Sequence, residues 1–211
     1  MNSPSLQPSA DAVVLVHGLA GHGVVMSPLA RALRGHFAEV SAWRYRSLWS
    51  RIERHGHALA ESLRRLDDRE RGRIHLVTHS LGGIIARLAL AEYAPRRLGR
   101  ILMLAPPNRG SHLATRAAPL LGRFFPPIAQ LCDEAGSFVC QLPPLAGADV
   151  GIIAASHDLL VREDSTHLAC ESDHITLPGL HVSLLWSRAT AEQVRHFLLH
   201  GRFHRANAAV A

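Results

Sequence analysis

Ser80 lies in the stretch LVTHSLGG (76–83), between an apolar run and a pair of glycines. Two interpretations are open: a tight turn with an incidental hydroxyl, or a nucleophile held on a strained bend between a strand and a helix. The second needs small residues around the serine, as in the pattern Gly-x-Ser-x-Gly. Gly82 fits this pattern, whereas Thr78 replaces its first glycine. The motif alone does not decide between them, so the rest of the chain must supply the groups that activate a serine.

A serine hydroxyl near neutral pH needs a histidine base, and the base needs a carboxylate that orients it. When the serine stands on a strand–turn–helix bend, the order along the chain is serine, acid, histidine. Asp158 follows the apolar run VGIIAAS (150–156), and His181 lies in the loop between the last expected strand and the last expected helix. We therefore predict that Ser80, Asp158 and His181 form a catalytic triad for acyl transfer to water.

Other residues could take the two supporting roles, because the chain contains 15 histidines. The alternative histidines are His157, His174, His196 and His200, and the alternative acids are Asp149, Asp164 and Asp173. His174 begins an expected strand, whereas His196 and His200 lie on an expected helix, and these are ordinary places for surface or core-edge residues. Asp158 and His181 are favoured because both follow strand ends, where a base can come within hydrogen-bond reach of Ser80.

The tetrahedral intermediate of acyl transfer carries an oxyanion, which backbone N–H groups commonly stabilise. The amide of Leu81 directly follows the serine and opens the expected helix. The glycine-rich stretch HGLAGHG (17–23) follows the first expected strand, and we choose the amide of Leu19 as the second donor. The alternative is an ordinary turn, since His-Gly pairs are common.

Apolar runs and amphipathic stretches alternate along the chain and provide the scaffold. We expect strands at 12–18, 38–45, 73–79, 99–105, 150–156 and 174–177. We expect helices at 27–35, 51–66, 81–94 and 190–201, with Ser27 as the cap of the first and a Thr190 capping box on the last. This alternation predicts one α/β domain over residues 12–205, with a mostly parallel sheet and helices on both faces. Reactive groups gather at the carboxyl ends of the strands in such sheets.

Residues 106–148 interrupt this rhythm. Seven of the 12 prolines fall here, at positions 106, 107, 119, 126, 127, 143 and 144. Long excursions of this kind are often lids or binding loops, so we predict a lid-like segment. Its apolar residues Leu120, Phe124 and Phe125, with Leu121 and Ile128, could line an acyl channel or could pack beneath the loop on the core. Residues 1–11 and 206–211 are predicted to be a flexible leader and tail.

Composition argues against several classes of protein. All 23 basic residues are arginine and they are spread from Arg31 to Arg205, so the net charge of +6 indicates a compositional bias rather than a nucleic-acid surface. No apolar run is long enough to span a membrane, and the N-terminus does not read as a secretion signal. Cys132, Cys140 and Cys170 are expected to be free thiols, although a Cys132–Cys140 bridge is conceivable. We expect a cytoplasmic protein, and no spacing of residues typical of a metal site is present.

Several stretches together resemble the α/β-hydrolase superfamily, in its small lipase and esterase branch. They are VLVHGLAG (14–21), VTHSLGG (77–83), MLAPPNRGSH (103–112), ASHDLLV (155–161) and LPGLHVSLL (177–185), within a match from about Val13 to Phe203. The resemblance implies a minimal α/β-hydrolase fold, the triad and oxyanion residues named above, and no metal or organic cofactor. It also implies a small-molecule or lipid ester as substrate. An acyltransferase or thioesterase with the same triad, or a non-catalytic lipid- or partner-binding member of the fold, remains an alternative.

Overall fold

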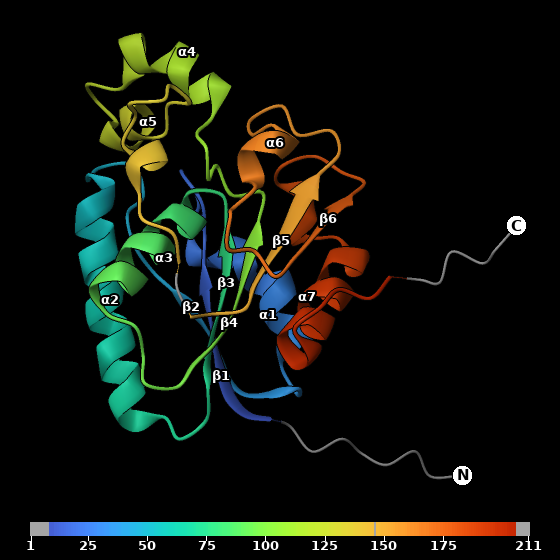
Figure 1. The fold of residues 1–211 in the computed structure, drawn as a ribbon. Coiled ribbons are helices and arrows are strands. Elements are labelled where there is room, and N and C mark those ends of the chain that lie inside the picture. The colour runs from blue at the N-terminus through green and yellow to red at the C-terminus, as the bar shows by residue number, and fades with distance from the viewer. Residues whose placement is uncertain (1–8, 146, 206–211) are drawn as a thin grey trace, which may run out of the picture.

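The computed structural model describes residues 9–145 and 147–205 (Figure 1). In that part of the chain, one sheet of six parallel strands has the order β2-β1-β3-β4-β5-β6. The strands are β1 (Ser9–Val16), β2 (Phe37–Trp43), β3 (Ile74–His79), β4 (Leu98–Leu104), β5 (Val150–Ala155) and β6 (Asp173–Leu177). This confirms the predicted α/β fold with a parallel sheet.

Helices cover both faces of the sheet (Figure 1). The helices α2 (Ile52–Arg69) and α3 (Leu81–Glu92) pack on one face, and α1 (Ser27–Leu33) and α7 (Arg188–His200) pack on the other. Successive β1 residues alternate between the two cores: Val14 and Val16 pack with α2 and α3, whereas Val13 and Leu15 pack with α1 and α7. Because the side chains of a strand alternate between faces, the run Val13–Val16 must be apolar throughout.

Several element boundaries differ from the sequence predictions. β1 begins at Ser9, which pairs with Phe37 of β2, so residues 9–11 belong to the sheet rather than to a flexible leader. The other residues of the predicted leader, 1–8, and the predicted tail, 206–211, lie outside the described residues. Helix α7 begins at Arg188, because the Ser187 hydroxyl accepts a hydrogen bond from the Thr190 amide at 3.2 Å. The capping box predicted at Thr190 is therefore wrong, and Met26 rather than Ser27 occupies the cap position of α1.

The excursion between β4 and β5 contains the helices α4 (His112–Leu121) and α5 (Pro126–Gln130) and a 3-10 turn η2 (Val139–Gln141). The Ser111 hydroxyl caps α4, and Pro119 lies inside it near its end. Arg87 on α3 holds the base of the excursion: its guanidinium donates to the carbonyl oxygens of Asn108 at 3.2 Å and of Leu142 at 2.9 Å. The excursion lies over the carboxyl ends of the strands, beside α6 (Glu163–Thr166) (Figure 1).

The cysteines Cys132, Cys140 and Cys170 are free thiols. No helix among residues 9–145 and 147–205 combines the length and the apolar character needed to cross a membrane. The remaining short elements are the 3-10 turns η1 (Gly23–Met26) and η3 (Ser183–Leu185), which precede α1 and α7.

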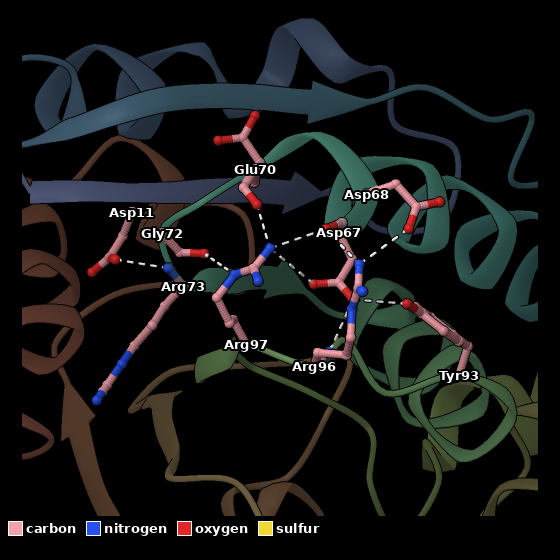
Figure 2. A network of polar contacts seen from close by, with 9 residues as sticks. All are labelled: Asp11, Asp67, Asp68, Glu70, Gly72, Arg73, Tyr93, Arg96 and Arg97. Atoms are coloured by element: carbon pink, nitrogen blue, oxygen red, sulfur yellow. Dashed lines mark hydrogen bonds and ion pairs between the residues drawn. The ribbon is translucent and has the colours of Figure 1, made fainter.

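A polar network at the opposite end of the sheet centres on Asp67, whose side chain is fully buried (Figure 2). Its carboxylate accepts hydrogen bonds from the Tyr93 hydroxyl at 2.8 Å, the Arg96 amide at 3.0 Å and the Arg96 Nε at 2.9 Å. The guanidinium of Arg97 lies 3.7 Å from the same carboxylate and also donates to the Asp67 carbonyl oxygen. These contacts fasten the end of α2 to the loop that leads from α3 into β4.

Replacing Asp67 by asparagine is expected to lower the free energy of unfolding by about 2–4 kcal/mol, because several charge-assisted hydrogen bonds weaken together. Burial alone raises the pKa of Asp67, but the hydrogen bonds from Arg96 and Tyr93 outweigh it and lower the pKa to about 2. The contribution of the carboxylate is therefore complete above its ordinary pKa of 3.8 and is lost as the pH falls toward 2. Urea unfolding of wild type and Asp67→Asn between neutral pH and pH 3 measures the loss of stability and its dependence on pH. An Asp67→Asn protein with wild-type stability at neutral pH would contradict the stabilising role of the carboxylate.

Candidate active site

Ser80 sits on a sharp bend between β3 and α3. Its backbone has φ 53° and ψ −125°, a conformation that non-glycine residues rarely adopt. The bend is held by hydrogen bonds from the Ser80 amide to the Leu104 carbonyl oxygen and from the Gly83 amide to the Ser80 carbonyl oxygen, both at 2.9 Å. An ordinary turn would not need a serine in this conformation, so the geometry favours a nucleophile elbow.

Small neighbours make the bend possible. A Cβ built on Gly82 would lie 2.5 Å from the Val16 carbonyl oxygen, which means that α3 packs directly on the backbone of β1. A Cβ built on Gly83 would lie 3.4 Å from the Thr78 Oγ1. Thr78 itself is buried, and its hydroxyl donates to the Leu102 carbonyl oxygen at 3.4 Å. The glycine at 83 thus leaves room for a threonine at 78, and the departure from the glycine pattern is accommodated.

His181 and Asp158 are in contact. The Nδ1 of His181 donates to the Asp158 Oδ2 at 2.6 Å, and the Asp158 side chain is only 2% exposed. The Asp158 Oδ1 accepts from the amides of Leu160 at 2.8 Å and Val161 at 2.9 Å. Burial alone raises the pKa of the Asp158 carboxyl, but its hydrogen bonds with His181 and the two amides hold that pKa below its ordinary value. The carboxylate is therefore charged at neutral pH and can fix the ring of His181, which leaves Nε2 free.

Ser80 and His181 line the same cavity, which has a volume of about 250 Å³. Among the described residues, no hydrogen bond joins the Ser80 hydroxyl to His181, whose Nδ1 is bonded to Asp158. Hydrogen bonds between a nucleophile and its base are often long before substrate binds and shorten in the complex. The structure thus brings Asp158 and His181 into contact and places Ser80 beside His181.

Apolar side chains form most of the cavity wall. The lining residues from α4, α5 and the acid loop are Leu113, Ala114, Ala117, Ile128, Leu131, Leu160 and Val161. The structure places Leu120, Phe124 and Phe125 elsewhere: Leu120 and Phe124 are 75% and 61% exposed, and Phe125 lies against Trp49 with 5.6 Å between ring centroids. Of the apolar residues considered in this segment, Ile128 alone lines the cavity. Leu113 and Ala117, about two turns and one turn before Leu120 on α4, take the place expected for it.

The two expected oxyanion donors border the site. Leu19 lines the cavity, and Leu81 is the first residue of α3, so its amide has no acceptor within the helix. The loop after β1 is fixed by Ala20, which has φ 56°, and by the Tyr45 hydroxyl, which donates to the His17 carbonyl oxygen at 2.7 Å. The roles of the Leu19 and Leu81 amides remain predictions.

His79 is a site residue that the sequence analysis missed. It is buried beneath Ser80, its ring lies 4.7 Å from the ring of His181, and its Nε2 donates to the His181 carbonyl oxygen at 3.1 Å. Burial lowers the pKa of His79 to about 3, so the ring is neutral at physiological pH. Its place directly before Ser80 on a buried strand was the available signal. His79 ties the loop that carries the base to the strand that carries the nucleophile.

Replacing His79 by phenylalanine is expected to reduce kcat for ester hydrolysis roughly tenfold, because one hydrogen bond that positions His181 is lost while the bulk of the ring is kept. His79→Gln retains a donor and should recover part of the loss. KM should change less than kcat, since His79 does not line the cavity. Steady-state kinetics with p-nitrophenyl esters measure kcat and KM, and thermal melts check that the variants are folded. Equal kcat values for wild type and the phenylalanine variant would remove this role.

One family model and a number of solved structures match this chain. Residues 13–202 match the model described as "Alpha/beta hydrolase family". Among solved structures, the propeptide form of lipase BlEst2 from Bacillus licheniformis superposes with a TM-score of 0.74 at 20% identity, over 100% of this chain and 53% of that one. This chain thus spans about half the length of that protein, but it covers 89% of the mature form, with a TM-score of 0.66 at 19% identity.

Two further structures show the range of similar proteins. Phospholipase PlaB from Legionella pneumophila gives a TM-score of 0.67 at 19% identity, over 88% of this chain and 57% of that one. The type II thioesterase BorB from the borrelidin biosynthetic cluster gives a TM-score of 0.64 at 19% identity, over 92% of this chain and 95% of that one. At such identities these likenesses establish the fold. No curated protein sequence matches the chain.

Proposed function

The chain belongs to the alpha/beta hydrolase family, and we propose that it is a serine hydrolase that cleaves carboxylic esters through an acyl-enzyme on Ser80. One observation carries the proposal: Ser80, with φ 53°, shares a cavity with His181, whose Nδ1 lies 2.6 Å from the buried carboxylate of Asp158. That arrangement is what a weak alcohol nucleophile requires.

In the proposed reaction, the Ser80 Oγ attacks the ester carbonyl carbon while His181 Nε2 removes its proton. Asp158 keeps the ring oriented and stabilises the imidazolium that forms. The amides of Leu19 and Leu81 donate to the oxyanion. His181 then gives its proton to the leaving alcohol, which departs and leaves the acyl group on Ser80. Water, deprotonated by His181, attacks the acyl-enzyme, and the acid leaves as Ser80 regains its proton.

The cavity supports a moderately apolar acyl chain as the preferred substrate group. Its wall is mainly aliphatic, with Ser80, Ser111 and His181 as its polar side chains, and its volume of about 250 Å³ suits a short or medium chain. A thioester is the second candidate, because the same three residues would attack a thioester carbonyl and because thioesterases are among the structures of similar fold. Comparing kcat/KM over a series of acyl chain lengths, for oxygen esters and thioesters in parallel, separates the two.

A fluorophosphonate probe is expected to label the wild-type protein on Ser80 and to leave Ser80→Ala unlabelled. Ser111→Ala is the matched control, because Ser111 lines the same cavity but its hydroxyl donates to the Leu160 carbonyl oxygen; it should label. Intact-protein mass spectrometry reads the adduct. Labelling that persists in Ser80→Ala, or ester hydrolysis by Ser80→Ala that a chelator abolishes, would overturn the proposal in favour of another nucleophile or a metal site. An inert wild type would favour a non-catalytic binding protein.

A further inference from the structure

Several exposed apolar side chains lie on the segments that border the cavity. We define this apolar rim by six residues: Leu113, Leu120, Phe124, Leu159, Leu180 and Val182. Leu113 and Val182 also line the cavity, and Leu159 and Leu180 directly adjoin Asp158 and His181 in the sequence. The rim therefore lies on the three segments that carry α4, the acid and the base. These segments share the end of the molecule where the strands terminate (Figure 1).

The exposure of the rim is costly in water. Leu159 and Leu120 are 76% and 75% exposed and Phe124 is 61% exposed, although the sheet has two well-packed cores nearby. Helix α4 contains no buried residue, so packing does not explain its leucines. Single exposed apolar residues are common, but several on neighbouring segments at one end of the molecule mark a surface that contacts something apolar.

The α4 side of the rim also carries positive charge without compensating acids. Residues 106–132 contain three arginines, at 109, 116 and 123, and no aspartate or glutamate. Arg116 stands three residues after Leu113 and four before Leu120, so it shares their face of α4. Arg123 lies over the ring of Phe124, with its guanidinium carbon 5.5 Å from the ring centroid.

The acids that follow in the sequence offset only part of this charge, since Asp133 and Glu134 reduce the balance over residues 106–134 from +3 to +1. Asp158 is buried against His181, and Asp133, the first acid after α5, hydrogen-bonds the Thr115 hydroxyl on α4. Across the cavity, Arg162 is followed by Glu163 and Asp164, so that stretch carries a net charge of −1. A small excess of positive charge thus remains on α4 and the residues that follow it, whereas the stretch across the cavity has none.

We propose that the apolar rim and the arginines of α4 dock this protein on a bilayer that contains anionic phospholipid. Leu120, Phe124 and Leu159 enter the acyl-chain region, while Arg116 and Arg123 lie at the level of the phosphates and bind them. The combination of apolar tips and cations fits this partner, whereas a second copy of the chain would bring arginine against arginine. Docking does not require Ser80; that the cavity then receives its ester from the membrane rests on the proposed function.

Vesicle sedimentation of the full chain with Ser80→Ala tests the docking surface without lipid turnover. This protein should bind vesicles of phosphatidylcholine mixed with phosphatidylglycerol, and should bind pure phosphatidylcholine vesicles at least tenfold more weakly. Arg116→Ala/Arg123→Ala should weaken binding to the mixed vesicles roughly tenfold or more, since each cation near the surface contributes on the order of a fivefold factor. Leu120→Asp/Phe124→Asp should weaken it by at least a similar factor.

The matched control is Arg65→Ala/Arg69→Ala, which removes the same charge from exposed positions near the end of α2 and should leave binding within about twofold. Circular dichroism verifies that each variant is folded. Binding that is equal for both lipid compositions, or that the control lowers as much as the α4 pair, would overturn the proposal. So would an absence of vesicle binding together with a dimer, seen by sedimentation velocity, that Leu120→Asp/Phe124→Asp dissociates. Failure of fluorophosphonate labelling with vesicle binding intact would reject the proposed function and leave the docking surface standing.

Discussion

His181→Ala is expected to lower kcat/KM for a p-nitrophenyl ester by roughly 10⁴ to 10⁶, the loss typical when the base of a serine triad is removed. The effect is large because, among the described residues, His181 is the histidine that lines the cavity with Ser80. His79, the histidine that packs against His181, has its pKa lowered to about 3 by burial and already uses its Nε2 on the His181 carbonyl oxygen. It therefore cannot replace His181.

His157→Ala is the matched control. His157 directly precedes Asp158, but it is exposed and its Nδ1 lies 2.8 Å from the Ser156 hydroxyl rather than near Ser80. Its removal should change kcat/KM less than about twofold. A second check uses non-additivity: because Ser80 and His181 act as one unit, the double variant should be no slower than Ser80→Ala alone. Comparable losses for His157→Ala and His181→Ala would show that the base is assigned to the wrong histidine.

The elements that carry the site could be predicted because their signals are local. Apolar runs that end in glycine or in a polar loop mark β1, β3 and β5. In each case a predicted site residue lies in the turn that follows the strand. Asp158 and His181 lie far apart in the sequence, yet both follow neighbouring strands of one parallel sheet, so their contact followed from topology. Whether Thr78 could stand at the elbow was not a local question, since the answer lies in a hydrogen bond to β4 and in the space at Gly83.

The excursion could not be predicted in the same way. The sequence analysis assigned it no helices, whereas Pro119 lies near the end of α4 and two prolines start α5. Without knowledge that residues 112–121 are helical, nothing showed that Leu113 and Ala117 line the cavity while Leu120, further along the helix, is exposed. His79 was missed for a different reason, because a histidine on a buried strand is usually a core residue and only its contact with His181 reveals more.

Gly82→Ala is expected to destabilise the fold by about 3 kcal/mol or more, the largest effect on stability that we predict for a change of one methyl group. Helix propensity alone predicts the opposite sign, since alanine is favoured over glycine in a helix by about 1 kcal/mol. Steric contact decides, because the new Cβ would lie 2.5 Å from the Val16 carbonyl oxygen and 2.8 Å from that of His17. Both belong to rigid backbone at the end of a central strand, so neither can yield without separating α3 from β1.

Gly136→Ala provides the comparison, because a Cβ at that position meets no atom within 4 Å. Its free energy of unfolding, measured by urea denaturation, should stay within about 0.5 kcal/mol of wild type. Any Gly82→Ala protein that folds should also lose activity, because α3 carries the amide of Leu81 and must move to admit the methyl group. If Gly82→Ala were as stable as Gly136→Ala, the close packing of α3 on β1 would be wrong. The strained conformation of Ser80, which depends on that packing, would then lose its physical basis, and with it the reason to regard residue 80 as a nucleophile.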